Sequence, residues 1–153
     1  MAKKTLYTAE ATASGGRNGT VRSSDGILDL QMSAPRGLGG RDGATNPEQL
    51  FAAGYASCFQ QALLVTAGKE KLTLDPAFTV GCEVALQQTD DGAYGLAATL
   101  TVRMPGVDRK QARALIERAH EICPYSVGTR GNMEVGLFLE EETGHRTNLA
   151  ETV

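Results

Sequence analysis

Residues 46–68 read NPEQLFAAGYASCFQQALLVTAG, and this segment decides how the rest of the chain must fold. Asn46 fits a helix N-cap, Pro47 fits the first helical position, and Gln49 at the third position is close to a capping box. Gly68 supplies a C-terminal stop, so the pattern predicts a helix that ends near residue 67. Apolar side chains occupy nearly the whole circumference of this helix, which is typical of a helix buried in a core.

The chain before this helix has the pattern of short β-strands. Residues 4–13 alternate loosely between apolar and polar side chains, and residues 19–24 and 27–33 flank the hairpin signal Asp25-Gly26. Of the ten residues that follow at 34–43, five are glycine or proline, which indicates a loop. We therefore expect three strands and a loop ahead of the long helix.

The chain after the helix begins with a strict alternation of side chains at residues 78–88, and the pattern repeats after a turn at residues 90–92. This repeat predicts an antiparallel hairpin with one buried face. The side chains expected to point inward are Phe78, Val80, Cys82, Val84, Leu86, Leu96, Ala98, Leu100, Val102 and Met104.

A second helix is predicted from a cap at Asp108 to a break at Cys123, because Pro124 disfavours helical backbone in the residue before it. A final strand is predicted at residues 133–140, followed by a polar tail that we expect to be mobile. Strands, helix, hairpin, helix and strand add up to a single α+β domain over residues 1–153.

Composition argues against several classes of partner. The 153 residues carry a net charge of −3, with lysine and arginine scattered singly, so no basic stripe can follow a nucleic-acid backbone. The longest apolar stretch, residues 50–65, is short for a membrane span and contains Gln60 and Gln61. The first ten residues have no apolar run of the kind found in a secretory signal. We expect a cytoplasmic protein with neither a nucleic-acid nor a membrane partner.

Cys58 and Cys123 are the residues most able to carry chemistry. In a cytoplasmic chain two placed thiols indicate a reactive redox pair, because disulfides there tend to be transient and catalytic. The alternative is that both are small buried hydrophobic residues, since free cysteine is among the most buried residue types. Cys123 also lies just ahead of a short helix that Pro124 could start, and a helix N-terminus favours a thiolate. Cys82, at an inward strand position, is expected to be structural.

One face of the long helix gathers a carboxylate, two aromatic rings and a thiol within an arc of about 80°: Glu48, Phe51, Tyr55 and Cys58. Ten helical residues separate Glu48 and Cys58 by about 15 Å along the axis, so the two cannot meet in one site on the same helix. An antiparallel copy of the helix in a two-fold dimer would bring Glu48 of one chain to Cys58 of the other.

The other charged and titratable residues are ambiguous when taken singly. Arg17 lies in the glycine-rich turn GGRNG at residues 15–19, where it is either a solvated charge or a side chain that the turn can swing over a site. His120 forms His-x-x-Cys with Cys123, but it has no second ligand pair at zinc spacing and is weakly suited to be the base of a Cys–His hydrolase. His145 lies in the tail. We expect no metal and no cofactor.

Three motifs in this order resemble the organic hydroperoxide resistance proteins of the Ohr/OsmC family. They are GGRNG at residues 15–19, TNPEQLFAAGYASCF at residues 45–59 and CPYSVGTRGN at residues 123–132. The resemblance covers nearly the whole chain, and the NPEQLF and CPYS segments look more like the Ohr branch than the OsmC branch. Val127-Gly128 departs from the commonest family pattern, and Cys82 lies outside the motifs.

The resemblance implies an α+β fold in which antiparallel sheets pack on long central helices within an intertwined homodimer. It implies a thiol-dependent peroxidase that reduces organic hydroperoxides, those of alkyl chains and fatty acids included, to alcohols in defence against oxidative stress. Cys58 would be the peroxidatic cysteine, oxidised to a sulfenic acid, and Cys123 the resolving cysteine that joins it in a disulfide. Arg17 and Glu48 would be the charged pair of the active site, and a lipoylated protein or dihydrolipoamide would be the reductant.

Phe51, Tyr55 and Phe59 predict an apolar approach to Cys58 that would suit the binding of an alkyl hydroperoxide substrate. Two other functions stay open from the residues alone. One is a non-catalytic thiol redox sensor, in which the same disulfide alters binding to a partner. The other is a small-ligand binding module with buried, inert cysteines.

Overall fold

The computed structural model describes residues 1–150, so the last three residues of the expected domain and tail lie outside the described part of the chain. The chain divides into two compact units, Met1–Leu50 and the remainder from Phe51 onward. The first unit carries the strands predicted ahead of the long helix. The second carries most of that helix, the predicted hairpin and the second helix.

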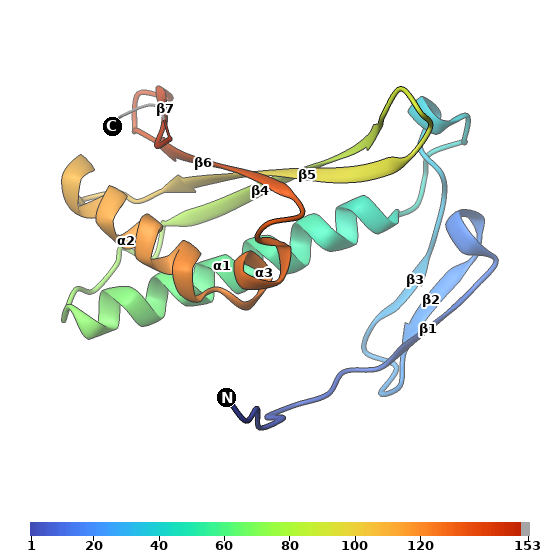
Figure 1. Cartoon of the computed structure of the whole chain (residues 1–153), viewed down its shortest axis with the longest axis horizontal. Coiled ribbons are helices and arrows are strands. Elements are labelled where there is room, and N and C mark those ends of the chain that lie inside the picture. The colour runs from blue at the N-terminus through green and yellow to red at the C-terminus, as the bar shows by residue number, and fades with distance from the viewer. Residues whose placement is uncertain (151–153) are drawn as a thin grey trace. The chain divides into compact units, whose positions relative to one another are not determined.

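The first unit contains a three-stranded antiparallel sheet in the order β1-β2-β3 (Figure 1). The strands are β1 (Ala11–Ser14), β2 (Thr20–Ser23) and β3 (Asp29–Gln31). The prediction of a strand at residues 4–13 is wrong for its first part. Strand β2 is only four residues long, so β1 finds a partner only from Ala11, which pairs with Ser23. The other two predicted strands are confirmed in shorter form, and the predicted loop contains a single 3-10 turn, η2 (Arg36–Leu38).

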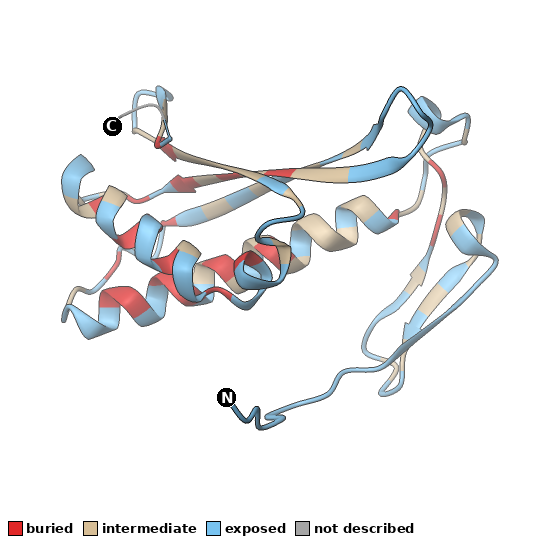
Figure 2. Cartoon of the chain, in the orientation of Figure 1, coloured by how far each residue is buried: buried red, intermediate tan, exposed pale blue. Residues whose placement is uncertain are grey.

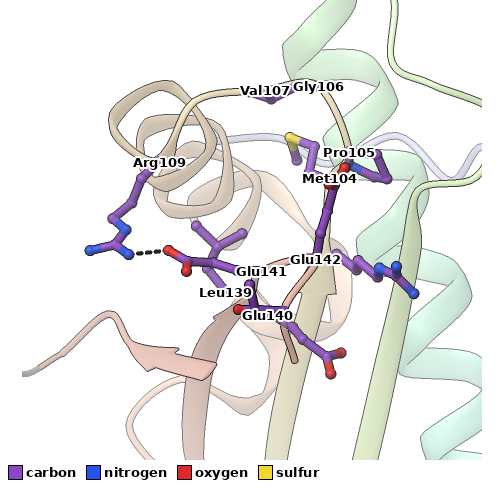
Figure 3. Close-up of a pocket in the computed structure, with 11 residues that line it drawn as sticks. Met104, Pro105, Gly106, Val107, Arg109, Leu139, Glu140, Glu141 and Glu142 are labelled. Atoms are coloured by element: carbon purple, nitrogen blue, oxygen red, sulfur yellow. Dashed lines mark hydrogen bonds and ion pairs between the residues drawn. The ribbon is translucent and has the colours of Figure 1, made fainter. Parts of the chain in front are cut away.

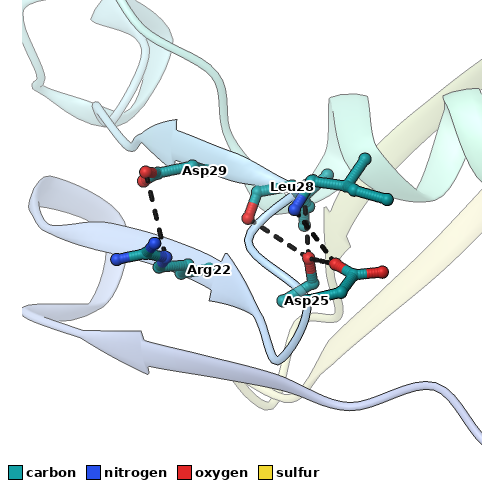
Figure 4. A network of polar contacts seen from close by, with 6 residues as sticks. Arg22, Asp25, Leu28 and Asp29 are labelled. Atoms are coloured by element: carbon teal, nitrogen blue, oxygen red, sulfur yellow. Dashed lines mark hydrogen bonds and ion pairs between the residues drawn. The ribbon is translucent and has the colours of Figure 1, made fainter.

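Side-chain hydrogen bonds close the turn between β2 and β3, where the hairpin was predicted (Figure 4). Asp25 Oδ1 accepts a hydrogen bond from the Ser23 hydroxyl at 2.6 Å, and Ser23 Oγ accepts one from the Leu28 N–H at 2.9 Å. The Ser23 bond lowers the pKa of the Asp25 carboxyl. Arg22 and Asp29 face each other across the strands at 3.9 Å, an exposed ion pair that contributes little to stability.

The long helix α1 (Pro47–Lys69) starts at the predicted cap, since Asn46 Oδ1 accepts a hydrogen bond from the Gln49 N–H at 2.9 Å. By length and composition alone α1 could cross a membrane, and the core helix of a soluble protein passes the same test. One side of α1 is buried in the described chain and the other is exposed (Figure 2). The expectation of a helix buried on all sides is therefore wrong for a single chain, in which Leu64 and Val65 are 45% and 40% exposed.

The predicted stop at Gly68 is also wrong, because α1 continues to Lys69 and ends in a Schellman motif. The Leu72 N–H bonds to the Ala67 carbonyl at 2.9 Å, and the Lys71 N–H bonds to the Gly68 carbonyl at 3.1 Å. Lys71 takes the left-handed backbone conformation of the motif, with φ of 56°. A lysine thus holds the position that glycine usually takes, which is why the glycine signal misplaced the helix end.

The second unit is a four-stranded sheet in the order β4-β5-β6-β7, with three helices on one of its faces (Figure 1). Its remaining elements are β4 (Thr79–Gln88), β5 (Tyr94–Arg103), α2 (Arg109–Ile122), α3 (Pro124–Thr129), β6 (Glu134–Glu140) and β7 (Arg146–Asn148). The hairpin β4–β5 is antiparallel as predicted, but β6 runs parallel to β5. The parallel pair arises because α2 and α3 form a crossover that returns the chain to the same end of the sheet.

The core of the second unit lies between the sheet and the helices. Leu100 and Val102 on β5 and Leu115 and Ile116 on α2 have no exposed surface. Full burial of such side chains contributes about 1.5–3 kcal/mol each. The inward face predicted for β5 is confirmed. The predicted inward residues within β4 are only half-buried, and Phe78, just before the strand, is buried.

The expectation of a mobile tail after residue 140 is wrong for the described residues. Strand β7 pairs with β6 through residues 146–148, and Leu149 is buried. Arg146 fixes this strand to the sheet, since its guanidinium lies 4.7 Å from the centre of the Phe138 ring and donates a hydrogen bond to Thr101 Oγ1 at 2.7 Å. These contacts join side chains on different strands of the sheet. They could not be predicted from the composition of the segment, which is polar.

Candidate active site

The structure brings the two predicted redox thiols together. Cys58 lies in the fourth turn of α1 and Cys123 at the junction of α2 and α3, and their Sγ atoms are 3.5 Å apart. The Cys123 N–H bonds to the Ala119 carbonyl at 2.8 Å as the last bond of α2. Pro124 then begins α3, as predicted, so that Cys123 closes one helix and caps the next.

Both cysteines are free thiols, and their surroundings differ. Cys123 is fully buried, whereas Cys58 is half-buried. Burial raises the pKa of Cys58, the backbone N–H of Tyr125 opposes this rise, and the neighbouring Cys123 adds to it. The sulfur atoms, 3.5 Å apart, would have to approach by about 1.5 Å to reach the disulfide bond length of about 2.05 Å.

Arg17 and Glu48 form the second predicted pair, and they meet within the first unit. Arg17 Nη1 donates to Glu48 Oε2 at 2.7 Å, and Arg17 Nη2 donates to Glu48 Oε1 at 2.6 Å. This two-pronged contact orients the planar guanidinium more firmly than a single charge contact would. The hydrogen bonds from Arg17 lower the pKa of the Glu48 carboxyl, and the carboxyl raises the pKa of Arg17.

Glycine makes the turn that carries Arg17. Gly15 has φ of 79°, in the left-handed region that favours glycine. At Gly19 a Cβ atom would lie 1.7 Å from the Ser14 carbonyl oxygen, so no larger residue fits there. The backbone of the turn that carries Arg17 therefore requires glycine at position 19 and favours it at position 15.

The three aromatic residues predicted to bind substrate lie in different surroundings. Tyr55 and Phe59 have no exposed surface in the described chain, and only Phe51 is half-buried. Phe51 and Tyr55 pack edge-on with ring centres 6.2 Å apart, and both contact Tyr125 of α3, at 5.9 and 5.7 Å. Gly54 makes room for this cluster, because a Cβ atom there would lie 2.7 Å from Tyr125 Oη.

A cavity of about 500 Å³ opens beside Cys58. Its walls are aliphatic and amide side chains with no aromatic ring: Ser57, Cys58, Gln60, Gln61, Ala62, Leu64, Val65, Ile122 and Pro124. Sequence reasoning missed these wall residues, although Leu64, Val65 and Ile122 were all visible as apolar positions in the two helices. Phe51 lines a separate cavity of about 610 Å³ with residues of β4 and β5, of the end of α3 and of the segment that leads into β6.

A third cavity, of about 320 Å³, lies at the ends of β5 and β6 and contains none of the predicted site residues (Figure 3). Three consecutive glutamates, Glu140 to Glu142, line one wall, and Arg109 binds Glu141. Within residues 1–150 no three His, Cys, Asp or Glu side chains, these glutamates included, are arranged so that they could hold a metal ion together.

Sequence reasoning missed buried Ser126, which lies beside the thiols, and its contact with half-buried His120. Ser126 of α3 has no exposed surface, and its Oγ lies 2.8 Å from Tyr55 Oη and 2.9 Å from His120 Nδ1. The signal in the sequence was the spacing, since His120 and Ser126 stand three residues on either side of Cys123.

Cys82 lies at an inward position of β4 as predicted, and burial raises the pKa of its thiol to about 11.

Comparison with known proteins places the chain in a family. The family model described as OsmC-like protein matches residues 39–137. An organic hydroperoxide resistance protein of Xanthomonas axonopodis pv. citri is 47% identical over 138 residues, which are 90% of this chain and 96% of that protein. The organic hydroperoxide resistance protein OhrB of Bacillus subtilis is 42% identical over 88% of this chain and 98% of its own.

Solved structures agree with the sequence comparisons. The organic hydroperoxide resistance protein of Elizabethkingia anophelis superposes with a TM-score of 0.85 at 46% identity, over 91% of this chain and 99% of that one. The crystal structure of OhrB of Bacillus subtilis gives a TM-score of 0.81 over 89% of this chain and 100% of that one. The chain therefore belongs to the OsmC/Ohr family, and the α+β fold expected from its motifs is confirmed.

The Arg17–Glu48 pair predicts a specific pH dependence. Because Arg17 lowers the folded-state pKa of Glu48, the pair contributes stability that is present above the unfolded pKa of about 4.3 and is lost as the pH falls through the folded value. We expect Glu48→Gln to lower the free energy of urea unfolding at pH 7 and to differ less from wild type at pH 3. Glu117→Gln, on the exposed α2 pair with Arg113, is the control. A Glu48→Gln deficit that is equal at both pH values would contradict the account.

Proposed function

We propose that this protein is a cysteine-based peroxidase that reduces organic hydroperoxides to alcohols in defence against oxidative stress. The observation that carries the proposal is the 3.5 Å distance between the Sγ atoms of Cys58 and Cys123, with a cavity beside Cys58 through which a peroxide can approach. The relatives named organic hydroperoxide resistance proteins support the same substrate class.

The proposed first step takes place at Cys58. Its thiolate attacks the terminal oxygen of the hydroperoxide, the O–O bond breaks, and the alkoxide leaves and is protonated to the alcohol. Cys58 is left as a sulfenic acid. Since burial raises the pKa of Cys58, this thiolate needs a positive neighbour, and Arg17 held by Glu48 is the proposed source of that charge.

The proposed second step joins the two thiols. Cys123 Sγ attacks Cys58 Sγ, the S–O bond breaks, and the oxygen leaves as water with the proton of the Cys123 thiol. A dithiol, which we propose to be dihydrolipoamide on a lipoylated protein, then reduces the disulfide by thiol–disulfide exchange. Both cysteines return to the thiol state and the dithiol is oxidised to its own disulfide. All reacting atoms belong to cysteines, the peroxide and the dithiol, so no cofactor is required.

Phe51, Tyr55 and Phe59 are proposed to form the apolar surroundings of this site. The protein is proposed to act in the cytoplasm.

We further propose that residues 1–153 form a single domain and that the protein acts as a homodimer. Helix α1 is continuous from Glu48 to Cys58, and ten residues of helix span about 15 Å, so a Glu48 that serves Cys58 must come from a second chain. The exposed apolar side chains beside the Cys58 cavity, Leu64, Val65 and Ile122, are 40–45% exposed and suit burial against another copy.

The division of labour between the thiols predicts different defects. We expect Cys58→Ser to abolish turnover of an organic hydroperoxide with dihydrolipoamide, because no sulfenic acid can form. Cys123→Ser should still consume about one equivalent of peroxide and then stop, because its Cys58 sulfenic acid has no resolving thiol. Cys82→Ala is the control and should turn over as wild type does. Sustained turnover by Cys58→Ser would refute the assignment, and stoichiometric reaction by wild type would favour a redox sensor.

The shared site predicts complementation between inactive chains. Glu48→Ala and Cys58→Ser should each be inactive alone, and mixing them under exchange conditions should restore activity, because one of the two sites in each mixed dimer is then intact. Peroxide consumption is measured before and after mixing, with Cys58→Ser mixed with Cys123→Ser as the negative control. Full activity in a species that sedimentation shows to be a monomer would contradict the dimer.

A further inference from the structure

A buried polar chain crosses the three helices next to the sulfur pair. Tyr55 Oη of α1 lies 2.8 Å from Ser126 Oγ of α3, and Ser126 Oγ lies 2.9 Å from His120 Nδ1 of α2. Tyr55 and Ser126 have no exposed surface, and the surrounding core is apolar. Buried polar groups are costly unless paired, so these three side chains hold one another in a fixed arrangement.

The polar chain flanks both reacting sulfurs. Cys58 follows Tyr55 by three residues on α1, which places the two on the same face of the helix. Cys123 lies midway between His120 and Ser126, three residues from each. The bonds made by Ser126 therefore tie the backbone on both sides of Cys123 to the helix turn that carries Cys58.

His120 has the properties of a neutral partner in this arrangement. Burial lowers the pKa of its imidazole, the nearby Arg130 lowers it further, and Glu121 opposes the change. Its backbone carbonyl also accepts a hydrogen bond from Arg130 Nη2 at 2.8 Å, and its ring faces Phe59 with centres 6.4 Å apart. A neutral His120 can accept from Ser126 while Ser126 accepts from Tyr55, or the two bonds can run in the opposite direction.

We propose that Ser126, held between Tyr55 and His120, is a positioning residue that keeps Cys123 against Cys58 for closure of the disulfide. The inference rests on the proposed peroxidase function and concerns only its second step. Positioning matters there because the Cys123 thiol and the Cys58 sulfenic acid react within one molecule when they are held near bonding distance, and a displacement of about 1 Å can cost about a hundredfold in rate. Attack of Cys58 on the peroxide makes no bond to Cys123, so its rate should change little when the polar chain is lost.

The test separates the two steps in the reduced protein after one equivalent of tert-butyl hydroperoxide. Rapid quenching with dimedone traps the Cys58 sulfenic acid, and quenching with an alkylating agent followed by peptide mapping measures the Cys58–Cys123 disulfide. In Ser126→Ala we expect sulfenic acid to form at the wild-type rate and the disulfide to close between about tenfold and about a hundredfold more slowly. The trapped sulfenic acid should accumulate accordingly.

A matched pair at His120 provides a second route to the same answer. Asparagine can place a polar atom near the position of Nδ1, whereas leucine cannot, so His120→Asn should close the disulfide faster than His120→Leu. His145→Leu, in the exposed loop before β7, is the control for loss of a histidine and should close it at the wild-type rate. Should Ser126→Ala not fold, this pair carries the test.

The outcomes distinguish the inference from the function on which it rests. Disulfide closure at the wild-type rate in both Ser126→Ala and His120→Leu would overturn the positioning role and leave the peroxidase intact. Equal slowing of both steps would also overturn it, because that result indicates a general loosening of the fold. A wild type whose Cys58 stays reduced would overturn the proposed function, and this inference with it.

Discussion

The packing of α3 against α1 is the interaction on which the site depends. It places Cys123 3.5 Å from Cys58 and points the Tyr125 N–H at the Cys58 sulfur. Glycine at position 54 permits this contact, because the Tyr125 hydroxyl occupies the space that a Cβ atom would need. The interruption of the helix at Pro124 matters equally, since it ends α2 and lets α3 turn back onto α1. A glycine and a proline thus determine whether the two thiols meet.

The electrostatics of the thiol pair set the second constraint. Burial makes Cys58 harder to ionise, so a peroxidase built on this residue must bring positive charge to it. The first unit contains a guanidinium oriented by a carboxylate, because both terminal nitrogens of Arg17 donate hydrogen bonds to the Glu48 carboxylate. An oriented guanidinium costs little reorganisation when negative charge develops on the sulfur or on the leaving oxygen. In the proposed mechanism the Arg17–Glu48 pair supplies the positive charge that the Cys58 thiolate needs.

Much of this architecture could be predicted from the sequence, for reasons that are local. The Asn46 cap, the alternation along β4 and β5, and the helix break at Pro124 depend on neighbouring residues, and all three are confirmed. The misses depend on distant residues, on side-chain contacts or on an unusual residue in a local motif. Strand β7 depends on a partner in β6, and the end of α1 uses a lysine where glycine is usual. The role of Ser126 was hidden because its partners come from two other helices.

The account is tested most directly by locating the bond that forms when the reduced protein meets one equivalent of an organic hydroperoxide. Peptide mapping without reduction, combined with the mass of the intact chain, identifies that bond. The account predicts the loss of two hydrogen atoms per chain, a cross-link between the peptides of Cys58 and Cys123, and a Cys82 thiol that can still be alkylated. A cross-link through Cys82, or two intact thiols at Cys58 and Cys123 after the peroxide is consumed, would contradict it.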